Sequence, residues 1–360
     1  MHVAIPKKGV RCPVCTCGDA VVEFTGVRDY HCGKPGCWRV LRCSRCRSLY
    51  IDPMPEPDRL MDLYAGYMTH TEPEHIRSEV QGGFWKRLRI KIRNGYLRES
   101  YGYCVEPAPR WGALVMKLLP KPFRAEWDHY ARHLGKPVPG RCKLLDVGCG
   151  NGEFLLRARC AGWDVKGLEP DPDAAAMARK AGLDVYVGTV EEAPYEEGSF
   201  DVITSHQVIE HVPDPHVFLD AVVKWLRPGG TLWLGTPNAC AWLLPRFGRH
   251  YVLLHVPYHL LLFSPGALIR ALESQGLGGV TLVRRGIRDI HVAMESDRIR
   301  RGLHPYGKEK PTFKSLMLGF LGELLAWFDP GRGSDLVVMA VKPACGRARA
   351  HQENLSMQGF

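Results

Sequence analysis

The sequence predicts an α/β protein whose parallel sheet follows a small cysteine-rich module. Three observations carry this prediction. From about residue 141 onward, short apolar segments alternate with amphipathic helical segments, which is the pattern of βαβ units. Seven of the 13 cysteines lie within the first 46 residues. Between these regions, residues 52–57 hold three prolines, which forbid a continuous helix or central strand there.

The apolar segments predict seven strands, and the segments between them predict helices because their apolar residues recur at helical spacing. The strands are expected at 143–147, 164–168, 184–187, 200–205, 231–236, 279–284 and 336–342. The helices are expected at 153–161, 172–181, 215–226 and 265–275.

Four regions follow from this pattern. They are a cysteine-rich module at 1–52, a helical connecting region at 53–140 that covers the substrate, an α/β domain at 141–345 and a polar tail at 346–360. Within the connecting region, residues 86–93 alternate cations with aliphatic side chains, which a basic strand requires and an amphipathic helix does not. These cations, together with the apolar segments 111–119 and 313–328, suit either a peripheral membrane contact or an ordinary core with a solvated face.

The composition excludes several classes of protein. A chain of 360 residues with 45% hydrophobic and 24% charged residues is neither disordered nor collagen-like. No run of about 18 uncharged apolar residues predicts a transmembrane helix, and no apolar region follows the first 11 residues as a secretory signal would require. We therefore expect a cytoplasmic protein. The net charge of +10 suits nucleic acid, anionic lipid or a phosphorylated substrate without choosing among them.

The most informative local motif is Asp-Val-Gly-Cys-Gly-Asn-Gly at 146–152, where a buried strand enters a glycine-rich turn and then a helix. Glycines let backbone groups approach a ligand without obstruction by Cβ atoms. Asp146 is placed to accept from an ammonium group, and Glu169, at the end of the second strand, to bind ribose hydroxyls. A nicotinamide-dependent Rossmann enzyme is disfavoured, because the spacing is GxGxG and the Leu-Arg-Pro-Gly-Gly turn at 226–230 has no role in dinucleotide binding.

From residue 141 to 342 the chain resembles the class I S-adenosylmethionine-dependent methyltransferases. Five motifs stand in that family's order: the glycine-rich turn, Gly-Leu-Glu-Pro-Asp at 167–171, the loop at 188–194, the strand at 200–203 and the turn at 226–230. The resemblance implies a Rossmann-like seven-stranded sheet and S-adenosylmethionine as the cofactor. The residues that it implies for binding this cofactor are Asp146, Gly148, Cys149, Gly150, Gly152, Glu169, Pro170, Thr189, Val190, Glu191, His206 and Gln207.

Two further segments concern the methyl acceptor. Glu-His-Val-Pro-Asp-Pro at 210–215 resembles the ubiquinone-biosynthetic O-methyltransferases and their small-molecule relatives, and residues 259–265 resemble the His-Leu-X-X-Phe-Ser/Thr-Pro element that covers the acceptor pocket in related enzymes. Transfer to a hydroxyl requires a base, and histidine suits that role. We rank His259 first, His255 second and His211 third, while each could instead be a structural histidine. The chain lacks the Asn/Asp-Pro-Pro-Tyr element of amino-methyltransferases.

Two CxxC pairs, separated by 27 residues, are formed by Cys12, Cys15, Cys43 and Cys46. Four thiolates at this spacing are typical of a closed tetrahedral site, so we expect a structural Zn²⁺ in a zinc ribbon. The neighbouring Cys17, Cys32 and Cys37 stay unassigned. Residues 40–53 and 64–67 resemble a bacterial group that joins a zinc ribbon to a methyltransferase.

These motifs together predict methyl transfer to a hydroxyl of a small-molecule acceptor, such as a secondary metabolite, a sugar or a glycan precursor. Two alternatives stay open. One is an RNA methyltransferase that binds RNA through the ribbon, although few aromatic residues interleave with the ribbon's cations. The other is a non-catalytic protein that binds S-adenosylmethionine and zinc. Nucleic acid is the less favoured partner, and the sequence does not fix the oligomeric state.

Overall fold

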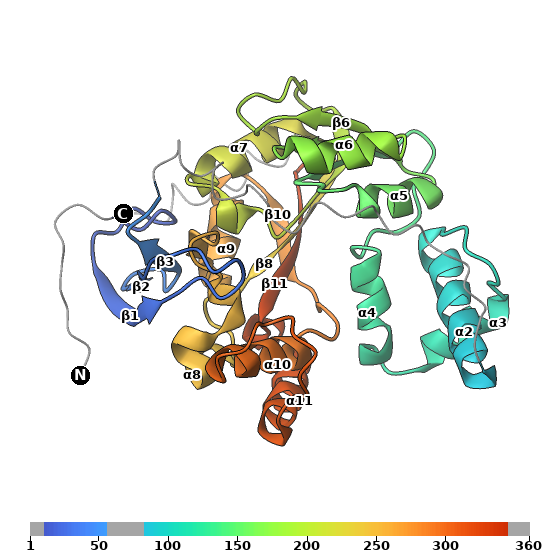
Figure 1. Ribbon diagram of the computed structural model, residues 1–360. Helices are drawn as coiled ribbons and strands as arrows, with labels where there is room; N and C mark the ends of the chain where they lie inside the picture. Colours follow the sequence, from blue (N-terminus) through green and yellow to red (C-terminus); the bar gives the residue numbers. More distant parts are fainter. Residues whose placement is uncertain (1–10, 56–82, 345–360) are drawn as a thin grey trace, which may run out of the picture.

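The computed structural model describes residues 11–55 and 83–344, and it confirms the predicted α/β fold class (Figure 1). Seven strands form one sheet in the order β10-β11-β8-β7-β4-β5-β6. They are β4 (Lys143–Val147), β5 (Asp164–Glu169), β6 (Asp184–Val187), β7 (Phe200–His206), β8 (Leu226–Pro237), β10 (Gly278–Leu282) and β11 (Asp335–Val341). Strand β11 is antiparallel to both neighbours, and the pairs from β8 to β6 are parallel. The segment 64–67 and the tail 346–360 lie outside the described residues.

Six of the seven predicted strands agree with the structure to within two residues at either end, and one differs. Strand β8 begins at Leu226, whereas the sequence predicted a turn at 226–230 and a strand from 231. The difference arises because the backbone N–H of Gly229 donates to the carbonyl oxygen of Lys342 at 2.7 Å, and the N–H of Lys342 donates to Gly230 at 3.0 Å. The expected turn therefore joins the hydrogen-bond ladder.

Helices α5 (Glu153–Cys160), α6 (Pro172–Lys180) and α7 (Pro215–Trp225) follow parallel strands of the sheet, and α9 (Pro265–Ser274) precedes β10. Three of these four helices, α6, α7 and α9, begin in the same way, with a capping side chain followed by proline. Asp171, Asp214 and Ser264 each accept a hydrogen bond from a backbone N–H of the first turn. Proline suits the position after the cap because its fixed φ matches the helix and its missing N–H is not needed there.

Two further groups of helices lie on one side of the sheet, below it in Figure 1. The first comprises α2 (Phe84–Tyr101), α3 (Arg110–Leu118) and α4 (Pro122–Tyr130), and the second α10 (Asp289–Arg300) and α11 (Phe313–Phe328). The expectation of a basic strand at 86–93 is wrong, because this segment is part of α2. Its buried Ile90, Asn94, Leu97 and Tyr101 recur at helical spacing, so one helical face packs inward whatever the pattern of cations. No helix among the described residues is long and apolar enough to cross a membrane.

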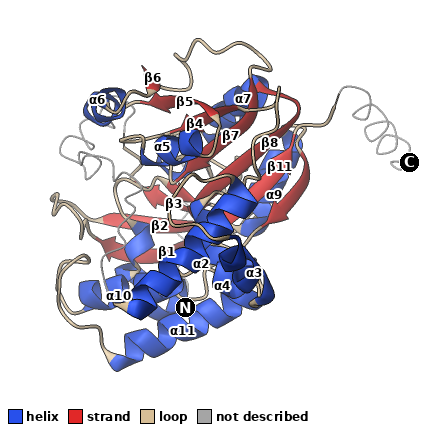
Figure 2. Ribbon diagram, turned by 90° about the vertical axis from the view of Figure 1, so that its right-hand side faces the viewer, coloured by secondary structure: helices blue, strands red, loops and turns tan. Residues whose placement is uncertain are grey.

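The cysteine-rich module forms a second, four-stranded sheet that is continuous with the rest of the molecule (Figure 2). Its strands are β1 (Ala20–Val27), β2 (Trp38–Cys43), β3 (Leu49–Asp52) and β9 (Leu261–Leu262). Strand β9 belongs to the segment after β8, and it pairs with β3 through Leu49 opposite Leu262 and Tyr50 opposite Leu261. The ribbon cysteines share one hydrophobic core with side chains of α7 and α9. The module is therefore part of one packed body.

The segment between β8 and β9 consists of short helices: α8 (Leu244–Phe247), η2 (Gly248–His250) and η3 (Val252–Leu254). Two other single turns are η1 (Ile209–His211), after β7, and η4 (Pro330–Arg332), before β11. Polar contacts also tie the ribbon to this part of the chain. The hydroxyl of Ser264 donates to the carbonyl oxygen of Cys46 at 2.6 Å, and Arg42 donates to that of Ala239 at 3.1 Å.

Candidate functional site

The predicted site residues converge at the carboxyl edge of the parallel strands. Strand β4 lies at the centre, with β5 on one side and β7 on the other, so the chain leaves β4 in opposite directions at this point. Ligands of open α/β sheets bind at such a switch point. Asp146 lies one residue before the end of β4, Glu169 ends β5 and His206 ends β7.

The glycine-rich turn after β4 depends on glycine at defined positions. Gly148, Gly150 and Gly152 have φ values of 72°, 55° and 82°, which side chains other than glycine rarely adopt. A Cβ atom on Gly148 would lie 2.2 Å from Cγ2 of Val208, in the segment after β7. A Cβ on Gly150 would meet nothing within 4 Å, so the backbone of Gly150 borders open space at this edge of the sheet. The turn therefore offers backbone N–H groups to a ligand.

Glu169 spans the distance between β5 and this turn. One carboxylate oxygen accepts from the N–H of Gly150 at 2.7 Å and the other accepts from that of Asp171 at 3.0 Å. Burial raises the pKa of Glu169 to about 7. Pro170 follows it and is exposed, and the loop with Thr189, Val190 and Glu191 is tied to the end of β5 by a hydrogen bond from Gly188. All the implied ribose and adenine residues thus lie around one end of β5 and β6.

Asp146 has a partner that sequence reasoning missed. Arg132, just after α4, forms a close ion pair with its carboxylate and donates to the hydroxyl of Thr204 at 2.7 Å. The guanidinium also lies 3.6 Å from the centre of the Phe154 ring. Asp146 is 1% exposed and Arg132 8%. Burial raises the pKa of Asp146, and the charge of Arg132 opposes that shift.

Several buried polar atoms at the end of β7 have no hydrogen-bond partner among the residues that the structure describes. They are Oγ of Ser205, Nε2 of His206 and Nε2 of Gln207. The ring of His206 lies 5.4 Å from that of His129 and 5.6 Å from that of Trp233, and burial holds the pKa of His206 well below its ordinary value. Because buried polar groups are nearly always hydrogen-bonded in native proteins, these atoms fit a site that a polar ligand fills. Cys149, within the glycine turn, is buried.

The three histidines proposed as the base lie together. The ring centre of His259 lies 4.8 Å from that of His211 and 4.8 Å from that of His255. They come from different segments: His211 ends η1 after β7, while His255 and His259 lie between η3 and β9. A fourth histidine, His31 of the ribbon, has its ring centre 3.8 Å from that of His255. No motif or spacing in the sequence indicates that His31 joins this group.

Hydrogen bonds to backbone carbonyls fix two of these rings. Nδ1 of His211 donates to Tyr258 at 2.9 Å, and Nδ1 of His259 donates to Leu253 at 2.8 Å. A neutral imidazole that donates from Nδ1 carries its lone pair on Nε2. Burial lowers the pKa of His211 to about 4 and holds the pKa of His259 well below its ordinary value. Both rings are therefore neutral at pH 7 and are able to accept a proton or bind a cation.

Glu210 completes this cluster. It is fully buried, and one carboxylate oxygen accepts from the hydroxyl of Thr236 at 2.9 Å, while the other has no hydrogen-bond partner in the described parts of the chain. Burial raises the pKa of Glu210 to about 8. One donor atom each from Glu210, His211 and His259 lie within 4.8 Å of one another, so these groups could hold a metal ion. The sequence did not single out Glu210 beyond its place in the Glu-His motif.

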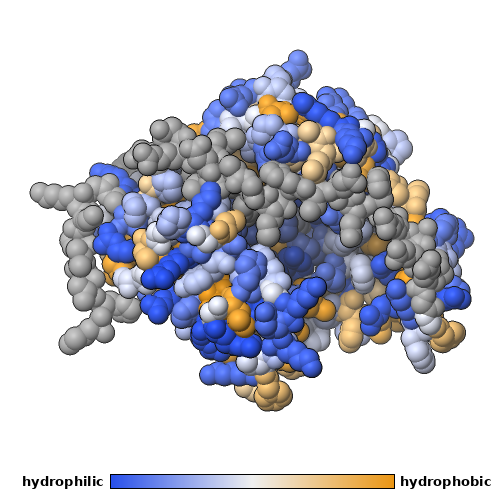
Figure 3. Space-filling view, viewed as in Figure 1, coloured by the Kyte–Doolittle hydropathy of each residue, from blue (hydrophilic) through white to orange (hydrophobic). Residues whose placement is uncertain are grey.

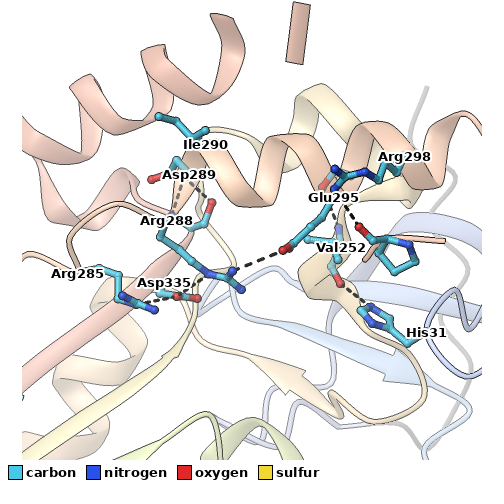
Figure 4. Close-up of polar contacts among 12 residues, drawn as sticks. His31, Val252, Arg285, Arg288, Asp289, Ile290, Glu295, Arg298 and Asp335 are labelled. Carbon is cyan, nitrogen blue, oxygen red and sulfur yellow. Dashed lines mark hydrogen bonds and ion pairs between the residues drawn. The ribbon is translucent and has the colours of Figure 1, made fainter. Parts of the chain in front are cut away.

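A charged cluster joins β11 to α10 (Figure 4). Asp335, the first residue of β11, is opposite Pro237 at the carboxyl end of β8. Its carboxylate lies 3.3 Å from Nε of Arg288 and 3.4 Å from Nε of Arg285, and Arg288 also lies 3.9 Å from Glu295 of α10. These ion pairs hold the start of α10 against the carboxyl edge of the sheet.

The four ribbon cysteines lie apart from this site, in a tight group. The Sγ atoms of Cys12 and Cys46 are 3.6 Å apart, those of Cys15 and Cys43 are 3.5 Å apart, and all four lie within 4.8 Å of one another. Four sulfurs at about 2.3 Å from a tetrahedral zinc ion would be roughly 3.8 Å apart. The donor set and its spacing therefore fit Zn²⁺.

Comparisons with known proteins agree with this geometry. A family model described as a methyltransferase domain matches residues 107–282. The chain is 33% identical over 173 residues to the ubiquinone biosynthesis O-methyltransferase of Pectobacterium atrosepticum, covering 44% of this chain and 70% of that protein. It is 30% identical over 190 residues to the enzyme of the same name from Aromatoleum aromaticum, covering 48% and 79%.

Among solved structures, an S-adenosylmethionine-dependent methyltransferase from Thermotoga maritima has 21% sequence identity and a TM-score of 0.38, covering 72% of this chain and 94% of that one. The seven-stranded sheet, the glycine-rich turn with its two acids and the matches to curated enzymes point to one conclusion. The chain belongs to the S-adenosylmethionine-dependent methyltransferases.

Proposed function

We propose that the enzyme transfers the methyl group to a hydroxyl of a small-molecule acceptor, such as a secondary metabolite, a sugar or a glycan precursor. The observation that carries this proposal is the neutral, buried His259, held between His211 and His255 beside the carboxyl edge of the sheet. A hydroxyl must lose its proton during transfer, and a neutral imidazole is a suitable acceptor. The name O-methyltransferase borne by the curated relatives supports the same chemistry.

The cofactor's methionine end would lie at the glycine-rich turn, among Gly148, Cys149, Gly150 and Gly152. When bound, S-adenosylmethionine supplies an electrophilic methyl group on a sulfonium. Asp146 provides a carboxylate for the ammonium group, and Arg132 provides a buried guanidinium for the carboxylate, beyond its contact with Asp146. Glu169 and Pro170 would face the ribose, while Thr189, Val190 and Glu191 would border the adenine. His206 and Gln207 have unpartnered buried nitrogens with which to contact the cofactor.

On the acceptor side, His259 is the first candidate for the base, His255 the second and His211 the third. His259 is 3% exposed, and its Nδ1 hydrogen bond to Leu253 leaves Nε2 to take the proton. Burial disfavours the charged imidazolium and holds the pKa of His259 well below its ordinary value, so the ring is neutral when the acceptor arrives. A divalent cation held by Glu210, His211 and His259 would act differently, by lowering the pKa of the acceptor hydroxyl.

The ribbon would hold one structural Zn²⁺ through Cys12, Cys15, Cys43 and Cys46. With four thiolates and no open position, the ion would contribute to folding and would take no part in the methyl transfer.

The test begins with binding and proceeds to turnover. Calorimetry measures the binding of S-adenosylhomocysteine. We expect micromolar affinity for wild type and loss of this binding in Glu169→Gln. Methyl transfer from labelled S-adenosylmethionine is then measured on a panel of phenols and sugar nucleotides. His259→Asn should lower kcat by about 10²–10⁴ while the affinity for S-adenosylhomocysteine is unchanged. The exposed His291 of α10 offers the matched control, since His291→Asn should change neither quantity.

Two results would redirect the proposal. Loss of wild-type turnover on addition of a chelator and its recovery with Mn²⁺, with the protein still folded, would assign the cluster of Glu210, His211 and His259 to a cation. A salt-sensitive gel shift with RNA, with no transfer to any small molecule, would replace the acceptor class with RNA.

A further inference from the structure

Large apolar side chains are exposed on this protein in an uneven way. The described residues include 19 exposed large hydrophobic side chains. Eight of them lie between residues 84 and 123, seven on α2, α3 and α4 and one just after α3, and six lie on α11. The most exposed are Trp85 at 78%, Leu118 at 78%, Phe313 at 82% and Phe328 at 81%. Scattered apolar residues on a surface are ordinary, but a concentration of this kind marks a binding surface.

Helix α11 is packed with its small residues inward. Its buried residues are Ser315, Gly319 and Gly322. A Cβ atom on Gly319 would lie 2.6 Å from Cα of Ile290 in α10, so the two helices touch through their backbones. The opposite side presents Phe313 and Phe320 to the outside, at 82% and 61% exposure. A helix of a water-soluble domain buries its large apolar residues instead.

Helices α2 and α3 repeat this arrangement independently. A Cβ on Gly95 would lie 2.3 Å from the carbonyl oxygen of Pro109, and one on Gly112 would lie 2.6 Å from that of Lys91. The pair therefore packs through glycines, while Leu114 and Leu118 of α3 are 61% and 78% exposed. Small residues at the contact between helices and large apolar residues outside are the pattern of helices that face lipid.

Both helical pairs extend from the same side of the molecule. In Figure 1 the lower ends of α2 and α11 reach below the strands of the large sheet, and α3 lies beside α2. The space-filling view in the same orientation has apolar surface at the lower margin in both places (Figure 3). Two separate apolar projections on one side of the protein can contact a broad, flat partner at the same time, which a single groove could not do.

The exposed charges nearest these apolar residues are mostly positive. Residues 84–98 and 107–125 contain no aspartate or glutamate, and the exposed cations there include Lys86, Arg89, Lys91 and Lys117. Lys314 is exposed next to Phe313 on α11. Lysine and arginine can bury their methylene groups in an interface while the charged ends stay at the headgroups. A second copy of this chain docked through the same surface would bring cations against cations.

We propose that α2, α3 and α11 together form an interfacial surface that binds an anionic lipid bilayer. The helices would lie along the headgroup region, with Trp85, Leu118, Phe313 and Phe320 inserted among the acyl chains and the lysines against the phosphates. This binding is separate from methyl transfer and requires neither cofactor nor acceptor.

The experiment is sedimentation of the full chain with vesicles, in the absence of acceptor. One set of vesicles is phosphatidylcholine alone, and the other contains phosphatidylcholine and phosphatidylglycerol. Wild type should bind the anionic vesicles and release as salt is raised, with little binding to the neutral set. The variants Phe313→Ser/Phe320→Ser and Trp85→Ser/Leu118→Ser should each weaken binding at least about tenfold.

A matched control is available on the far side of the sheet. Val217 of α7 is 40% exposed, and Val217→Ser should bind vesicles as wild type does. Retained binding of S-adenosylhomocysteine by every variant shows that each has folded. Lys86→Glu/Lys91→Glu should remove the preference for anionic vesicles. Absence of binding by wild type would overturn the proposal, as would a dimer that the apolar variants dissociate in the absence of any vesicle binding.

Discussion

The ion pair between Arg132 and Asp146 allows a quantitative test of how the cofactor site is held together. Both side chains are buried, and the pair is reinforced by the hydrogen bond to Thr204 and the ring of Phe154. Breaking a buried pair by removing one partner leaves an uncompensated charge, which costs about 3–5 kcal/mol. We therefore expect Asp146→Asn and Arg132→Met each to lower the free energy of unfolding by about 3–5 kcal/mol.

The double variant Asp146→Asn/Arg132→Met should cost no more than either single variant, because it leaves no buried charge and methionine still fills the space beside Phe154. Urea unfolding followed by tryptophan fluorescence measures all three free energies. The solvent-exposed pair of Lys166 and Asp184, 2.9 Å apart, is the control, and Asp184→Asn should cost at most about 1 kcal/mol. The reasoning would be refuted if the double variant lost as much unfolding free energy as the two single variants together. Such additivity is typical of independent sites, whereas the effects of substitutions in a coupled pair are not additive.

Three further predictions concern the turn, the ribbon and the histidines. Gly148→Ala should abolish binding of S-adenosylhomocysteine in calorimetry, because the new methyl group would lie 2.2 Å from Cγ2 of Val208. Gly150→Ala should fold and weaken this binding less, because a Cβ atom on Gly150 would border open space. Cys12→Ser should lose zinc in elemental analysis and lower the Tm, since that cysteine belongs to the shared core. Burial lowers the pKa of His31 to about 4, so the unfolded state binds more protons between pH 6.5 and 4. Stability should therefore fall on acidification by up to about 1.4 kcal/mol per pH unit, and His31→Asn should reduce this slope in urea titrations.

The sheet could be predicted because each of its strands is specified by a local pattern. Alternating strands and helices, proline after a capping residue and glycine in the turn all act within a few residues. Asp146, Glu169 and His206 lie at strand ends, so their convergence follows once the strands are parallel. The sequence marks His211 and His259 only as separate candidates for the base, and their contact across 48 residues of sequence follows from no local pattern.

Other features depend on contacts that no local pattern encodes. Arg132 lies in an irregular segment with a φ of 49°, where neither spacing nor motif marks it as a partner of Asp146. His31 joins the histidine cluster only because β3 pairs with β9 and draws the ribbon onto the segment before β9. The alternation of cations with aliphatic residues at 86–93 predicted a strand, and that prediction is wrong. The burial of one helical face of α2 decides the structure of this segment, and its surface cations do not.

The pairing of β3 with β9 also decides whether this protein is modular. A truncated chain that began after the ribbon would leave the edge of β9 unpaired and would uncover the apolar side chains of α7 and α9 that now share a core with the cysteines. The same pairing sits two residues from His259, so the loop that carries the proposed base is anchored by the ribbon. The ribbon therefore cannot be exchanged like a detachable tag. Any homologue that lost it would have to rebuild this wall of the acceptor region from other residues.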